Sequence, residues 1–105
     1  MTKVLIVDDN AIVRAGLQAV LGRVDTVTET LEAEDAFTAL EAAATHSPDI
    51  ILLDVSMPPG RSGLDILPEL VGNASVIMLT SMQDPALIRQ ALDAGARGYL
   101  VHGQL

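Results

Sequence analysis

The residues Lys3-Val4-Leu5-Ile6-Val7-Asp8-Asp9 give the clearest indication of how this chain folds. An uninterrupted aliphatic run of this length is typical of a strand in a parallel sheet, because helices cover such a sheet on both faces. The run stops at two aspartates, which places two carboxylates directly after the strand. The same pattern returns at Ile50-Ile51-Leu52-Leu53-Asp54. The repeat predicts two parallel strands, each followed by acidic residues.

Four helical stretches separate the strand-like runs. They show apolar residues at spacings of three and four, or a capping residue that marks a start. They begin after Asn10, near Ala36, after Gly63 and at Pro85. Pro68 removes a backbone donor from the third helix, so that helix is expected to be short or kinked. The remaining strands are expected at 27–32, 76–79 and 98–102.

The alternation of strands and helices predicts an α/β fold with a doubly wound, five-stranded parallel sheet. This pattern calls for a fifth helix after His102, and residues 103–105 are too few to form one. The chain is therefore expected to be one domain, truncated before that helix. An uncovered apolar side on the last two strands predicts a non-native or swapped homodimer when the chain exists alone.

Composition excludes several classes of protein. The 105 residues suit one domain, and the absence of cysteine excludes disulfides, thiolate metal sites and thiol nucleophiles. Acidic residues outnumber basic ones 14 to 6, which argues against direct contact with nucleic acid and permits a divalent cation or a basic partner. The start does not resemble a signal peptide and the apolar runs are too short to span a membrane, so a cytoplasmic domain is expected.

Polar side chains with complementary chemistry end the predicted strands. In an open α/β sheet, ligands bind beyond the carboxyl ends of the strands. The residues at these ends are Asp8, Asp9, Asp54, Thr80, Ser81 and His102. A single aspartate there needs no functional explanation, because the loop that follows a strand is exposed to water. Three carboxylates together repel one another unless a hard cation lies among them, and oxygen ligands suit Mg²⁺ or Mn²⁺.

These residues and their spacing resemble a known family. Asp8-Asp9, Asp54-Val55-Ser56-Met57-Pro58, Thr80-Ser81 and the segment 95–101 together resemble a response regulator receiver domain. The resemblance covers the whole chain and is closest to the branch that carries a LuxR-type helix-turn-helix output domain. It implies a flavodoxin-like sheet with strand order 2-1-3-4-5. It also implies two partners, a sensor histidine kinase and the regulator's own DNA-binding domain in a longer parent protein.

The resemblance assigns a role to each site residue. Asp54 corresponds to the phosphoacceptor, which takes a phosphoryl group from a phosphohistidine. Asp8, Asp9, Asp54 and the backbone carbonyl of Ser56 correspond to the Mg²⁺ ligands. Thr80 corresponds to the hydroxyl that contacts the phosphoryl group, and Tyr99 to the aromatic that changes rotamer with it. Such a domain is a phosphoacceptor with at most intrinsic autophosphorylation and dephosphorylation, not an enzyme.

His102 departs from the family pattern. Receivers typically end the fifth strand with a lysine that contacts the phosphoryl group, and the only lysine here is Lys3. Histidine is shorter than lysine and titrates near neutral pH, although acidic neighbours favour its charged form. One interpretation is weaker or pH-dependent coupling between Asp54, Thr80 and Tyr99. The other is that His102 is a passive residue at the end of a strand.

Three other functions are known for folds or sites of this kind, and the residues bear on each. A haloacid-dehalogenase-type phosphatase needs a second aspartate two residues after the nucleophile, and Ser56 stands there. A mononucleotide or flavin site needs a glycine-rich loop where Asp8 and Asp9 stand. The remaining alternative is an atypical, phosphorylation-independent receiver that binds a ligand or a protein.

Several residues have simpler interpretations. Tyr99 is also explained as a half-buried packing residue on an edge strand. Phe37 is predicted to lie in the core, because it occupies an apolar position of a helix. Met57 and Met78 are predicted to be packing or loop residues without a chemical role.

Overall fold

The protein, described here as a computed structural model, is defined for residues 1–58, 60–80 and 84–101. Strands and helices alternate through this part of the chain. The strands are β1 Thr2–Val7, β2 Val27–Ala33, β3 Ile50–Leu53, β4 Ser75–Thr80 and β5 Gly98–Val101. The helices are α1 Ala11–Leu21, α2 Ala36–His46, α3 Gly63–Leu70 and α4 Pro85–Asp93. His102 to Leu105 lie outside the described residues, as does Ser81.

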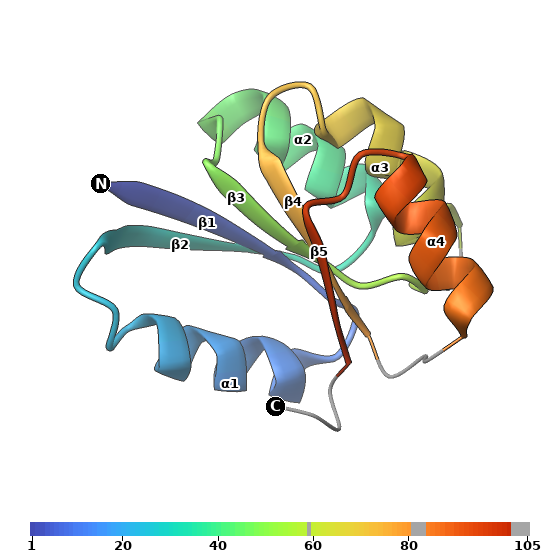
Figure 1. The fold of residues 1–105 in the computed structure, drawn as a ribbon. Helices are drawn as coiled ribbons and strands as arrows, with labels where there is room; N and C mark the ends of the chain where they lie inside the picture. The colour runs from blue at the N-terminus through green and yellow to red at the C-terminus, as the bar shows by residue number, and fades with distance from the viewer. Residues whose placement is uncertain (59, 81–83, 102–105) are drawn as a thin grey trace.

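The sheet confirms the predicted topology. Its strands are all parallel and lie in the order β2-β1-β3-β4-β5. Helix α1 lies on one face of the sheet, and α2, α3 and α4 lie on the other (Figure 1). Pairing of Val7 with Leu53, and of Leu53 with Met78, brings the carboxyl ends of β1, β3 and β4 to the same edge. All predicted site residues that the structure describes lie at these ends, shortly after them, or on β5.

Side-chain caps start the helices at the predicted places. The side chain of Asn10 accepts hydrogen bonds from the backbone N–H groups of Ile12 and Val13 at the start of α1. Asp84 accepts from Ala86 at the start of α4, with Pro85 in the first turn. Each cap satisfies backbone donors that a helix cannot satisfy itself. Helix α3 is short, eight residues with Pro68 inside it, as the sequence predicted.

The main core lies between the sheet and the helices α2, α3 and α4. It is aliphatic, and Met57 and Met78 are buried packing residues in it, as predicted. The prediction for Phe37 was wrong, because its side chain is 73% exposed. Helix α2 turns the small residues Ala36 and Ala39 toward the sheet, and Phe37 follows Ala36 by about 100° around the helix axis.

Helix α1 packs less tightly than the other helices. None of its residues is buried, and Ile12 and Val20 are 83% and 63% exposed. Side chains alternate along β5, so Leu100 points to the face opposite Tyr99, which packs against the main core. Leu100 is 45% exposed. In the described part of the chain, this side of the sheet therefore has apolar surface that α1 does not cover. We call it the open side.

Candidate functional site

Three aspartates meet at the carboxyl ends of β1 and β3. Asp8 and Asp54 each follow the last residue of a strand, and the backbone N–H of Asp54 donates to the carbonyl of Val7 at 2.9 Å. Asp9 follows Asp8 on the same loop. One carboxylate oxygen from each of the three residues lies within 4.8 Å of the other two. The prediction that strand ends bring these carboxylates together is therefore confirmed in geometry.

Local hydrogen bonds orient two of these carboxylates. Asp8 is 3% exposed, and its Oδ1 accepts from the backbone N–H of Asn10 at 2.8 Å. Asp54 is partly exposed, and its Oδ1 accepts from the backbone N–H of Ser56 at 3.4 Å. Both are turns in which an aspartate bonds the backbone two residues on. Such turns give each carboxylate a preferred direction on its loop, and Ser56 itself lies exposed beside Asp54.

The charge of this cluster is unfavourable without a cation. Burial, and then the charges of Asp8 and Asp9, together raise the pKa of Asp54 to about 6, against the lowering effect of the Ser56 and Val55 N–H groups. At neutral pH the three carboxylates therefore place like charges close together, where they repel one another. A set of carboxylate oxygens at this spacing fits a hard divalent cation such as Mg²⁺ or Mn²⁺.

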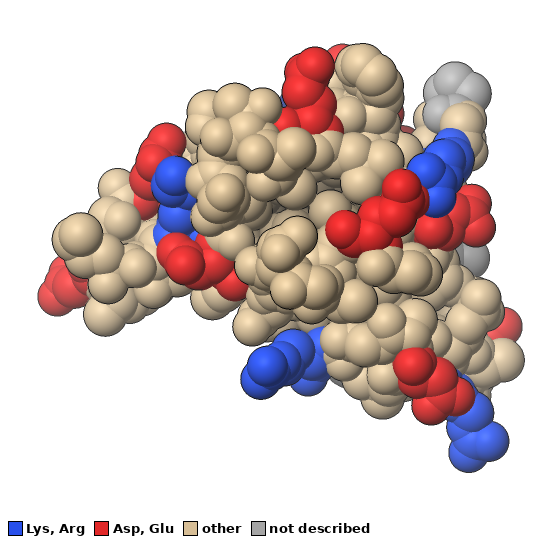
Figure 2. All heavy atoms as spheres, turned by 90° about the horizontal axis from the view of Figure 1, so that it is seen from above, with Lys and Arg blue, Asp and Glu red and all other residues tan. Residues whose placement is uncertain are grey.

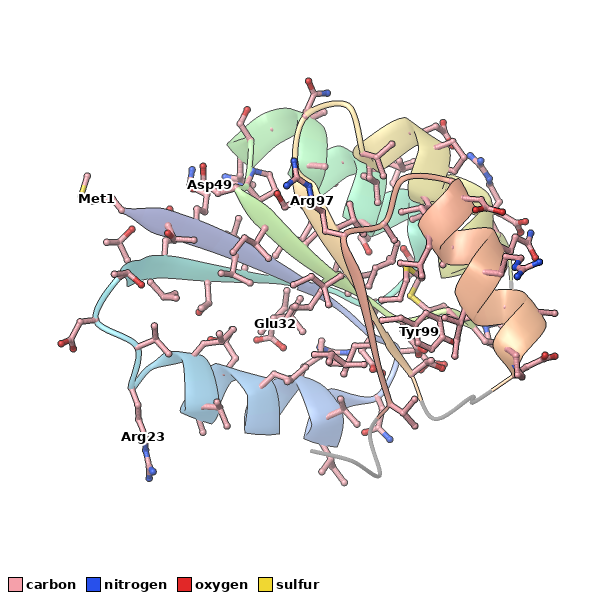
Figure 3. The ribbon with its side chains drawn as sticks, in the orientation of Figure 1. Met1, Arg23, Glu32, Asp49, Arg97 and Tyr99 are labelled. Carbon is pink, nitrogen blue, oxygen red and sulfur yellow. The ribbon has the colours of Figure 1, made fainter. Side chains whose placement is uncertain are left out.

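Thr80 and Tyr99 connect this edge of the sheet to α4. Thr80 ends β4 beside β3 and is 1% exposed. Tyr99 pairs with Met78, and its ring packs against the core on the α4 side of β5 (Figure 3). Burial, and then the charges of Asp84 and Asp54, raise the pKa of the Tyr99 hydroxyl. The Tyr99 hydroxyl therefore lies within electrostatic reach of both Asp84, which caps α4, and Asp54. The prediction for His102 concerns a residue outside the described part of the chain.

Two residues outside the sequence motifs also shape the site. Gly63, the first residue of α3, lies against the backbone of Asp54, and its N–H donates to Val55 at 2.8 Å. Arg14 of α1 donates from Nη1 to the carbonyl of Asp8 at 2.6 Å. One signal for Arg14 was available, since a cation in the early turns of a helix opposes the helix dipole and needs another reason.

Comparison with known proteins identifies the family. The model of the response regulator receiver domain matches residues 4–102. The chain belongs to this family. The receiver was predicted from motifs at strand ends, and the match extends over nearly all of the described residues. No helix in the described part of this receiver is long and apolar enough to cross a membrane.

Individual relatives support the LuxR-type branch. The receiver is 38% identical over 103 residues to the transcriptional regulatory protein LnrK of Bacillus subtilis, covering 96% of this chain and 47% of LnrK. It thus spans about half the length of this relative. A LuxR-family two-component response regulator from an Aurantimonas species is 30% identical with a TM-score of 0.88, covering 96% of this chain and 74% of that one.

A third relative bears on the acidic cluster. A response regulator from Burkholderia pseudomallei is 26% identical, with a TM-score of 0.87 over 97% of this chain and 60% of that one. Its structure contains a phosphorylated aspartic acid, a calcium ion and citrate. That observation belongs to the relative. In this receiver, the observation that bears on cation binding is the cluster of three carboxylates.

Proposed function

We propose that this receiver takes a phosphoryl group onto the Asp54 carboxylate and that Asp8, Asp9, Asp54 and the Ser56 carbonyl hold Mg²⁺ or Mn²⁺. The observation that carries the proposal is the approach of the three carboxylates to within 4.8 Å. A divalent ion bound there supplies charge neutralisation for the transferred group and its acceptor. Asp54 is the acceptor because it is the one of the three that follows β3, at the centre of the sheet and beside β4.

The chain's own residues then carry out the transfer. An Asp54 carboxylate oxygen forms a bond to phosphorus while the bond from phosphorus to the donor breaks, and the donor's leaving group keeps the electron pair. The turn to the Ser56 N–H orients the attacking carboxylate. The Thr80 hydroxyl donates to a phosphoryl oxygen. The domain is a stoichiometric acceptor rather than an enzyme that turns over a substrate.

Switching follows from the position of Thr80 and Tyr99. Movement of Thr80 toward a phosphoryl oxygen frees space at the end of β4, and Tyr99 moves toward it, which changes the surface formed by α4 and β5. With His102 in place of lysine, we propose that this coupling is weaker or depends on pH. A His102→Lys variant that switches no better than the parent would count against that idea.

The proposed setting is bacterial two-component signalling. The phosphoryl donor is the phosphohistidine of a sensor histidine kinase, in the cytoplasm. Residues 1–105 form the receiver, and a DNA-binding output domain belongs to a longer parent. This segment is not expected to contact nucleic acid itself. On the face seen in Figure 2, the few basic side chains are dispersed and mostly lie near acidic ones.

Phosphoryl transfer is tested by labelling with radioactive acetyl phosphate in the presence of Mg²⁺. The parent is expected to form an acid-stable, base-labile label, and Asp54→Asn to label only at background. The matched control is Asp49→Asn, which lies at the opposite end of β3 (Figure 3) and keeps an oxygen to accept from the Lys3 N–H. It should label like the parent. A parent that stays unlabelled while folded would favour the phosphorylation-independent alternative.

We also propose that the chain, when it exists alone, forms a homodimer through the open side of the sheet. Exposed Leu100, together with the partly exposed Leu52 and Ile77, gives this side an uncharged surface on a chain of net charge -8. Leu100→Glu is expected to shift the protein to monomer in analytical ultracentrifugation. Leu92→Glu, at a similarly exposed position of α4, is the control and should leave the dimer intact. A monomeric parent at high concentration would contradict this proposal.

A further inference from the structure

The guanidinium of Arg14 joins two separate parts of the fold. Its Nε donates to Oε1 of Glu32 on β2 at 2.8 Å, and its Nη1 donates to the carbonyl of Asp8 at 2.6 Å. The side chain of Arg14 is only 15% exposed, although it lies on a helix that buries none of its residues completely. Arginine presents donors in a rigid planar fork, which suits two acceptors held at fixed positions. The contact therefore links β2 to the loop that follows β1.

Glu32 is itself held in place. Its second carboxylate oxygen accepts from Nε2 of Gln18 at 3.2 Å, and the Gln18 side-chain oxygen accepts from the hydroxyl of Thr30. Figure 3 shows Glu32 on the side of the sheet that faces α1. Because Glu32 has partners on both oxygens, it gives Arg14 a fixed anchor. An unheld exposed carboxylate would let the arginine move with it.

The carbonyl that Arg14 contacts belongs to the peptide bond between Asp8 and Asp9. A peptide group is planar, so fixing its oxygen fixes the orientation of the unit that connects the two residues. On the other side, the N–H of Asp8 donates to the carbonyl of Ala33 at 3.1 Å. The backbone at the first aspartate is thus held from both directions. The direction in which both carboxylates leave the chain depends on this arrangement.

From these contacts we propose that Arg14 is a positioning residue for the divalent cation. It holds the Asp8–Asp9 peptide so that both carboxylates face Asp54, and Glu32 anchors it in that role. The inference rests on the proposed cation site and adds to it a residue that touches none of the three carboxylates in the contacts described. Partners of this kind orient ligands, and their loss typically weakens metal affinity about 10-fold or more.

The charge of Arg14 and its proposed positioning role predict opposite changes in cation affinity when Arg14 is replaced. A positive group near a cation site repels the cation, so removing its charge should strengthen binding if charge were its only effect. Loss of positioning should weaken binding. A lysine at the same place keeps the charge but lacks the planar fork, so it cannot serve both oxygens in the same way. The sign of the change in affinity therefore separates the two roles.

The experiment is calorimetric titration of MnCl₂ into the parent, Arg14→Gln and Arg14→Lys, with urea unfolding as a check on folding. Arg14→Gln is expected to bind Mn²⁺ about 10-fold more weakly, and Arg14→Lys is expected to be weakened as well. Arg23→Gln removes the same charge from an exposed residue that points away from the fold (Figure 3), and should bind like the parent. If Arg14→Gln does not fold, the Mn²⁺ affinity of the milder variant Arg14→Lys tests the positioning role.

The outcomes distinguish this inference from the proposed function. If the parent binds Mn²⁺ and the folded Arg14 variants bind it as tightly or more tightly, the positioning role is wrong and the cation site stands. If the folded parent binds no Mn²⁺, the cation site is wrong and the positioning role falls with it. Weaker binding in both variants, with Arg23→Gln unchanged, supports the positioning role.

Discussion

Replacing Gly63 with alanine is expected to lower the free energy of unfolding by about 3 kcal/mol, the upper end of the usual cost of overpacking a core. A Cβ atom at this position would lie 1.7 Å from the carbonyl oxygen of Asp54 and 2.8 Å from its carbonyl carbon. These are backbone atoms, so no side-chain rotation relieves the clash. Either the start of α3 or the Asp54 loop must move. Urea unfolding of the two proteins measures the loss.

The same substitution at Gly16 provides a control of opposite sign. Gly16 lies within α1, and a Cβ atom there would meet nothing within 4 Å. Alanine at an exposed helical position should stabilise the protein, by up to about 1 kcal/mol. The two variants add the same methyl group, at one position that has no room for a Cβ atom and at one that has room. A Gly63→Ala protein as stable as the parent would contradict the close contact between α3 and Asp54.

Gly63→Ala should also impair phosphoryl acceptance in molecules that remain folded. The clash falls on the backbone of Asp54, and we expect the Asp54 loop to move, which displaces the carboxylate from Asp8 and Asp9 even where the fold survives. Labelling by acetyl phosphate, corrected for the folded fraction, is expected to fall, while Gly16→Ala labels like the parent. Loss of stability without loss of labelling would mean that α3 moves and the Asp54 loop does not.

The fold could be predicted because its strongest signals are local in the sequence. Aliphatic runs such as 4–7 and 50–53 leave few alternatives to buried parallel strands, and caps such as Asn10 and Asp84 mark where helices begin. The prediction that Phe37 is buried was wrong because helical periodicity gives the spacing of an apolar face but not the position of its centre. Alanines at 36 and 39 bring α2 close to the sheet, and the aromatic side chain is left outside.

The carboxylate cluster could be predicted because strand ends converge whatever the details of packing. The residues that support it could not. The contact of Arg14 with the Asp8 carbonyl depends on the distance between α1 and β2, which periodicity does not give. The sequence predicted Gly63 only as the residue before the third helix, and its proximity to Asp54 appears only when α3 is placed. Supporting contacts between distant segments are tertiary features, and one sequence carries little trace of them.

The charge on Asp54 is expected to destabilise the folded protein, so that Asp54→Asn is more stable than the parent at neutral pH. Burial and the charges of Asp8 and Asp9 raise the Asp54 pKa from 3.8 to about 6, so between these values the folded state holds a proton that the unfolded state releases. Stability from this group is therefore present at low pH and lost as pH rises through about 6. Without screening, the loss is about 3 kcal/mol. Because the carboxylate is partly exposed, we expect about 1–2 kcal/mol.

Urea unfolding in EDTA at about pH 7.5 and about pH 4 tests this expectation. The advantage of Asp54→Asn should be present at the higher pH and shrink at the lower one, where the parent's Asp54 is mostly protonated. Mg²⁺ should stabilise the parent at the higher pH and stabilise Asp54→Asn less, since asparagine supplies no negative ligand. Asp49→Asn, outside the cluster, should show no such gain. If Asp54→Asn were less stable than the parent at both pH values, the three carboxylates would not be repelling one another, and the main physical reason for a cation between them would be gone.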